Sequence, residues 1–159
     1  MTGPDTGPAI QRAVTLRDLG RPAEALKLVR GALAQQPQDY QAQFLNARLL
    51  LDLGRTAEAL RAAQTAAGFF PSDAALLALL ARVQRESGAH RKAEQTARQV
   101  LALEPDHLAA RLELGLALFE QANGGSAAGR AGLLPQVHSV ADDLLREALT
   151  CRWAIPCTP

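Results

Sequence analysis

Residues 54–71 read GRTAEALRAAQTAAGFFP, and two other segments follow the same pattern. GRPAEALKLVRGALAQQP lies 34 residues earlier, at 20–37, and GAHRKAEQTARQVLALEP lies 34 residues later, at 88–105. Each segment begins with glycine, has alanine in its sixth place and ends with proline. A fixed period of this size is typical of repeat proteins, in which copies of one small unit stack along an axis.

Each unit reads as two helices joined by a short turn. Glycine can end the first helix because it adopts a left-handed backbone without strain, and a proline such as Pro22 can sit in the first turn of the second. Asp73 and Asp106 follow closing prolines and are expected to cap the helices that begin there. The pattern predicts helices at about 8–19, 22–35, 40–53, 56–69, 73–87, 90–103 and 106–121.

These helices are apolar on more than one side. In the third unit Leu77 and Leu80 share one face, while Leu79 and Val83 share a neighbouring face. A helix with two apolar faces packs on both sides, as in a stack where every unit is buried against the next. Because aromatic residues make up only 4% of the chain, the core has to be built from leucine and alanine, which favours closely packed helices.

The pattern resembles the tetratricopeptide repeat (TPR). That repeat has alanine four residues before an aromatic residue, and a closing proline. Here Ala25, Ala59 and Ala93 keep the alanine, whereas valine or alanine replaces the aromatic residue. The resemblance implies an all-α fold, a right-handed α-α superhelix (a TPR-like solenoid) of helical hairpins. The repeats are expected at about 6–39, 40–73, 74–107 and, in degenerate form, 108–150.

The fourth unit departs from the period. The glycine expected at position 122 is absent, and the second-helix pattern of Ala93 and Ala97 returns at Ala141 and Leu145, 48 residues later rather than 34. The difference of 14 predicts an insertion at about 122–135. This segment is rich in glycine, alanine and serine, and it is expected to be a mobile loop.

The two ends lie outside the TPR-like domain at 8–150. Residues 1–7 contain a Gly-Pro step and are expected to be disordered, and residues 151–159 form a C-terminal tail. Trp153 and Ile155 of this tail could fold over the last apolar face, or a longer protein could continue with further repeats.

Composition argues against several classes of function. Seventeen basic and 16 acidic residues give a net charge of +1, whereas nucleic-acid binding requires a basic surface. The longest apolar run, 74–81, is far shorter than the roughly 20 residues that span a bilayer, so no membrane insertion is expected. The N-terminus lacks the pattern of a signal peptide. Cys151 and Cys157 lie together at one end and favour a reducing compartment, and the chain is predicted to be cytoplasmic.

No catalytic or metal-binding constellation stands out. The three histidines are isolated in the sequence, and His138 with Cys151 and Cys157 fits no zinc spacing. The segment 124–129 is G-x4-G, but Arg-Ala follows it where a phosphate-binding loop has lysine and then serine or threonine. The sequence therefore predicts a protein that is not an enzyme and that has no cofactor or metal.

A partner is expected in a groove. In TPR proteins the first helix of each pair lines a concave groove, and the resemblance implies this role for three positions in each unit. Members of one set lie at i, i+4 and i+7, so they share a helix face. The positions hold Ile10, Val14 and Arg17; Phe44, Arg48 and Leu51; Ala78, Arg82 and Arg85; and Leu112, Leu116 and Phe119.

Charge is patterned along the same helices. Arg48 and Arg82 are one period apart and are expected on adjacent helices. Apolar side chains and guanidinium groups together can anchor a peptide and hold its carboxylates. Alternatively, the arginines pair with an acidic row of the same period and keep the groove hydrated. That row consists of Asp18, Asp52, Glu86 and Glu120.

These observations predict a non-catalytic scaffold for protein–protein interaction. It would bind a peptide segment or partner protein in its concave groove, and the arginines favour an acidic partner. Two other interpretations remain. The chain could be the accessory TPR domain of a larger enzyme, such as a transferase, or a module that self-associates through uncovered ends.

Overall fold

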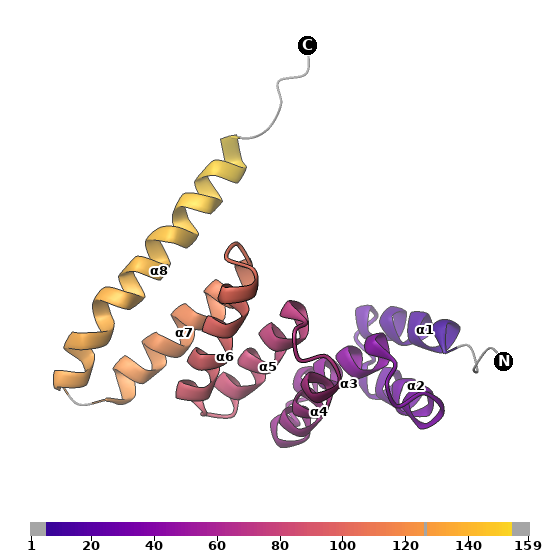
Figure 1. Cartoon of the computed structure of the whole chain (residues 1–159). Coiled ribbons are helices and arrows are strands. Elements are labelled where there is room, and N and C mark those ends of the chain that lie inside the picture. Colours follow the sequence, from indigo (N-terminus) through magenta and orange to yellow (C-terminus); the bar gives the residue numbers. More distant parts are fainter. Residues whose placement is uncertain (1–5, 126, 154–159) are drawn as a thin grey trace, which may run out of the picture.

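The computed structural model describes residues 6–125 and 127–153, and these residues form eight α-helices and no strand. The helices are α1 (Gly7–Asp18), α2 (Pro22–Gln35), α3 (Tyr40–Asp52), α4 (Thr56–Phe69), α5 (Ala74–Glu86), α6 (His90–Leu103), α7 (Leu108–Gly124) and α8 (Ala127–Trp153). They follow one another as four hairpins along a curved stack, from α1 and α2 at one end to α7 and α8 at the other (Figure 1). The predicted all-α solenoid is confirmed.

Glycine closes the turn inside each of the first three hairpins. Gly20, Gly54 and Gly88 have φ of 73°, 70° and 82°, and no other described residue has a positive φ. In the second hairpin the amide of Gly54 donates to the carbonyl of Leu51, and the amide of Arg55 donates to that of Leu50, each at 2.9 Å. These bonds pair carbonyls that the end of a helix otherwise leaves free, which fixes the direction of the next helix.

Small side chains line the contact between the two helices of a hairpin. Ala47 in α3 and Ala59 in α4 have no exposed surface, and the same holds for the alanines one period away from each. In the last hairpin Gly115 takes the corresponding place, and a Cβ there would lie 3.1 Å from Val140 Cγ1 in α8. The period in the sequence is therefore a period of close helix contacts.

The N-caps of the first helices also keep the period. Asp39 accepts a hydrogen bond from the amide of Ala42 at 3.0 Å, and Asp73 accepts one from Leu76 at 2.8 Å. The prediction for Asp106 is wrong, because the period places the third cap at His107. The Nδ1 atom of His107 accepts from the amide of Ala110 at 3.2 Å.

The predicted mobile loop at 122–135 is also wrong. The segment forms the end of α7 and the first part of α8, which contains Pro135. Leu133 and Val137 are partly buried against a small core cluster that includes Ala97, Leu114 and Leu118. Burial of these side chains offsets the loss of one helical hydrogen bond at the proline.

The register of α8 explains the error. Leu133, Val137 and Val140 repeat the i, i+4, i+7 spacing of Ala93, Ala97 and Val100, 40 residues later. The excess over the period is thus six residues rather than 14, and lengthened helices absorb it. Ala141 and Leu145, which were expected to pack, are exposed.

The expectations for the chain ends fall mostly outside the described residues. Of the predicted disordered segment 1–7, only Thr6 and Gly7 are described, and they begin α1. Cys151 and Trp153 lie in the last turn of α8, while Ile155 and Cys157 lie beyond the described part of the chain.

Replacing Gly54 with alanine is expected to destabilise the protein by about 1 kcal/mol, because a Cβ is strained at positive φ. Gly68→Ala is the matched control. Gly68 lies in α4 with open space around its Cα, so this change is expected to leave stability equal or raise it by up to about 1 kcal/mol. Denaturant unfolding followed by circular dichroism measures both, and equal effects would contradict the role given to the turn.

Candidate functional site

A pocket of about 330 Å³ opens between α1, α3 and α5. Among its lining residues, Ile10 and Leu45 are buried, and Val14 and Phe44 are half-buried. The remaining lining residues are Gln11, Arg17, Tyr40, Gln41 and Ala75. Four residues that the sequence placed in the groove, Ile10, Val14, Arg17 and Phe44, thus lie around one hollow.

Tyr40 also lines this pocket, although it is not among the groove positions predicted from the sequence. Its hydroxyl donates to Asp73 Oδ1 at 3.1 Å, and its ring lies edge-on to Phe70 with centroids 5.2 Å apart. The ring of Phe44 is 6.3 Å away on the pocket side. Burial, the hydrogen bond to Asp73 and the charge of that carboxylate all raise the pKa of Tyr40 above its usual value.

The hydroxyl of Tyr40 belongs to a pattern that links neighbouring units. Thr6 stands one period before Tyr40, and its hydroxyl donates to Asp39 just as Tyr40 donates to Asp73. Both acceptors are N-cap carboxylates of the next first helix. The pocket wall is therefore held in place by the same bond that ties two units together.

The arginines further along the groove have acidic neighbours. Arg82 Nε lies 3.0 Å from Glu86, and Arg48 Nε lies 4.0 Å from Asp52, each one turn away on the same helix. Both arginine side chains are 40% exposed. Exposed pairs of this kind contribute little to stability, so a bound carboxylate can replace the partner at small cost.

Three other predicted groove residues lie between neighbouring first helices. Leu51 and Ala78 are 6% and 4% exposed. Arg85 is tied to α7, because its guanidinium lies 2.8 Å from Glu113 and 3.2 Å from Glu120. In this conformation the three side chains hold units together rather than face the groove.

The ion pair of Arg85 and Glu113 is largely buried, with side chains 15% and 8% exposed. Burial alone would lower the pKa of Arg85, but the hydrogen bond and charge of Glu113, followed by those of Glu120, raise it overall. One period earlier the two positions hold Leu51 and Leu79. The joint between α3 and α5, meaning the contact between neighbouring first helices, thus has a leucine pair where the joint between α5 and α7 has an ion pair.

The predicted groove residues of α7 are the most exposed. Leu112 and Phe119 are 47% and 49% exposed, and Leu116 is half-buried. The pocket between α1 and α3 does not include them.

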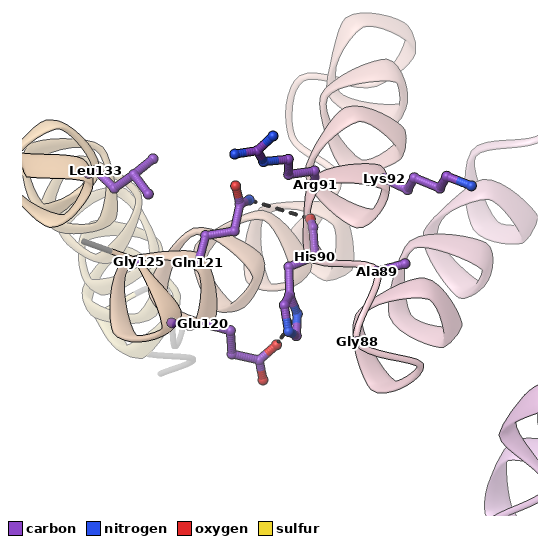
Figure 2. A pocket seen from close by; sticks show the side chains of 11 residues that line it. Gly88, Ala89, His90, Arg91, Lys92, Glu120, Gln121, Gly125 and Leu133 are labelled. Carbon is purple, nitrogen blue, oxygen red and sulfur yellow. Dashed lines mark hydrogen bonds and ion pairs between the residues drawn. The ribbon is translucent and has the colours of Figure 1, made fainter.

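A second cavity of about 590 Å³ lies where the start of α6 meets the end of α7 and the start of α8 (Figure 2). His90 Nδ1 is 2.8 Å from Glu120 Oε2, and Gln121 donates to the carbonyl of His90 and to Glu94. These contacts fix the last hairpin to the third. Among the side chains that the structure describes, no group of three could hold a metal ion.

Tyr40→Phe is expected to cost about 1 kcal/mol at neutral pH, because Asp73 loses a donor. In the wild type the folded state favours the neutral phenol, so its contribution is complete below a pH of about 10 and is lost as the pH rises above it. Tyrosinate absorbance reports this titration directly, since Tyr40 is the sole tyrosine. A titration at the free-tyrosine value in the folded protein would contradict this account.

Glu113→Leu is expected to destabilise the protein by about 2 kcal/mol or more, because Arg85 stays partly buried without its nearest carboxylate. The double variant Arg85→Leu, Glu113→Leu recreates the leucine pair of the preceding joint and is expected to be at least as stable as the wild type. Denaturant unfolding of the wild type, the two single variants Arg85→Leu and Glu113→Leu, and the double variant tests whether the two side chains form a coupled ion pair. Additive effects would show that the two side chains are not coupled.

Comparison with known proteins bears on the family and the fold. Among solved structures, the chain is similar to the MamA protein, with 17% identity, a TM-score of 0.74, and coverage of 98% of this chain and 80% of that one. The first TPR of Spaghetti (RPAP3), bound to the HSP90 peptide SRMEEVD, has 16% identity, a TM-score of 0.68 and coverage of 74% and 95%. The second TPR domain of human RPAP3, in complex with the HSP70 peptide SGPTIEEVD, has 20% identity, a TM-score of 0.65 and coverage of 69% and 91%. Structural similarity at this low sequence identity shows only that the fold is shared.

No curated protein sequence matches the chain. In the described part of the chain, no helix has the length and apolar character that crossing a membrane requires. Two family models do match. Both are described as tetratricopeptide repeat, one over residues 16–83 and the other over 78–134. The two matches overlap and together span residues 16–134, which is most of the sequence. The chain belongs to the tetratricopeptide repeat family.

Proposed function

We propose that this chain is a non-catalytic interaction module that holds a segment of a partner protein in its concave groove. The observation that carries the proposal is the pocket between α1, α3 and α5, whose lining combines buried apolar side chains with exposed polar ones. A preformed hollow of this kind can hold one bulky side chain of a partner.

The pocket has the chemistry of a peptide site. Ile10, Val14 and Phe44 offer apolar contact to an inserted side chain. Gln11 and Gln41 are exposed at its edge, and their amides can both donate to and accept from a peptide backbone. The lining contains no histidine, cysteine, serine or carboxylate.

Charge further along the groove favours an acidic segment. Arg17, Arg48 and Arg82 each have one carboxylate neighbour on their own helix, and these exposed pairs are weak. A ligand carboxylate that takes the place of Asp52 or Glu86 gains a charge-assisted bond. The peptides bound by the RPAP3 domains, SRMEEVD and SGPTIEEVD, combine carboxylates with apolar side chains, and this supports the same class of ligand here.

The expected ligand is therefore an extended segment with one bulky apolar residue and at least one nearby carboxylate. Selection from a random peptide display library tests this directly, followed by calorimetry on the selected peptides. Phe44→Ala is expected to weaken binding at least about tenfold, because the pocket loses a wall. Arg48→Glu is expected to weaken binding of acidic peptides more than that of neutral ones.

Leu103→Ala is the matched control, because Leu103 is an exposed apolar residue near the end of α6 that does not line the pocket. Its affinity is expected to equal that of the wild type. Selected peptides without an apolar consensus, or equal binding by Phe44→Ala, would rule out the pocket as the site.

A further inference from the structure

The last hairpin carries most of the exposed apolar surface. Among the described residues, eight large apolar side chains are exposed, and five of these lie on α7 and α8. We call these five the C-terminal end face; they are Leu108, Leu112 and Phe119 on α7, and Leu134 and Leu145 on α8. Exposed apolar side chains gathered in one place mark an interaction surface more often than single ones do.

The period shows what covers the corresponding face in an inner unit. One period before Leu112 and Phe119 stand Ala78 and Arg85 of α5. Ala78 is 4% exposed, whereas Leu112 is 47% exposed. Arg85 contacts Glu113 and Glu120 of α7. Leu112 and Phe119 of α7 therefore occupy positions at which an inner unit is covered by the first helix of the following unit.

The corresponding positions of α8 are also exposed. In the register fixed by its core contacts, Leu134 corresponds to Glu94 of α6, which accepts a hydrogen bond from Gln121 of α7. Ala141 corresponds to Leu101, which packs against the buried cluster that contains Leu114. The exposed sides of α7 and α8 thus form one surface at the end of the stack (Figure 1), and no described helix covers it.

The opposite end of the stack has a different character. On α3 the side facing the preceding hairpin carries Leu45 and Leu49, both buried. One period earlier, α1 carries Gln11 and Thr15 there, and both are exposed. A polar helix cannot replace the apolar first helix that the C-terminal end face would accept. Head-to-tail stacking of copies is therefore disfavoured.

We propose that the C-terminal end face binds the same face of a second copy, forming a two-fold symmetric dimer. A two-fold contact joins identical surfaces, so it is closed and leaves both polar ends outward. Polar side chains at the edge of the face agree with this arrangement. His138 and Asp142 lie one turn apart on α8 and are both exposed, so in an antiparallel copy an imidazole N–H of each His138 can donate to the other copy's Asp142. Leu112 and Phe119 are also predicted groove positions, so this dimer would close the groove at α7. The pocket between α1, α3 and α5 contains no residue of α7 or α8 and lies outside the dimer contact.

Sedimentation velocity of the full chain, from about 1 µM to about 100 µM, tests the proposal. The wild type is expected to pass from monomer to dimer with no larger species. Leu112→Glu and Leu145→Glu lie on different helices, and each is expected to weaken association at least about tenfold, because each buries an unpaired charge. Circular dichroism checks that both variants keep the wild-type helix content, as expected for exposed positions.

Two control variants decide between modes of association. Leu19→Glu alters an exposed leucine at the N-terminal end of the stack, and Leu103→Glu alters one on α6 outside the C-terminal end face. Both are expected to dimerise like the wild type. A monomer at every concentration overturns the proposal, as does dimerisation unaffected by both end-face variants. Loss of association in Leu19→Glu, or a series of growing oligomers, would show head-to-tail stacking instead.

Discussion

Each hairpin in this protein depends on its neighbour, because two helices with apolar residues on more than one side cannot bury all of them against each other. Leu49 illustrates the dependence, since it is fully buried where α3 meets the preceding hairpin. Burial of one such side chain contributes about 1.5–3 kcal/mol. Stability is therefore shared among joints between units, and each joint can be built differently. The joint between α5 and α7 shows this, because an ion pair there replaces a leucine pair.

The period alone predicted the first six helices, because glycine, alanine and proline each have a local physical role that repeats. The fourth unit could not be predicted in the same way. Its second helix was aligned through Ala141 and Leu145, which have the right residue types but are exposed. The residues that pack, Leu133 and Val137, lie in a segment whose glycines suggested a loop. Burial against Leu114 outweighs that local preference, and nothing near in sequence reveals it.

The candidate site was predicted in part. The family resemblance placed Val14 and Phe44 in the groove, each within its own i, i+4, i+7 set, and the structure brings them to one pocket. Tyr40 was missed because it is the first residue of α3, outside the i, i+4, i+7 set. The ion pair of Arg85 could have been predicted from the sequence. Glu113 stands where the two preceding units have leucine, and a carboxylate at a core position indicates a cation nearby.

The two edges of the stack differ in how much they can change in length during evolution. On one edge, every connection from a second helix to the next first helix has four residues, at 36–39, 70–73 and 104–107. In the first two, a hydroxyl from the preceding first helix bonds the cap, so an inserted residue would break a bond between units. The tips within hairpins lie on the other edge, and the six extra residues of the last unit are found there. Natural length variants of this fold should therefore gain and lose residues at the tips within hairpins, while the connections between hairpins keep their length.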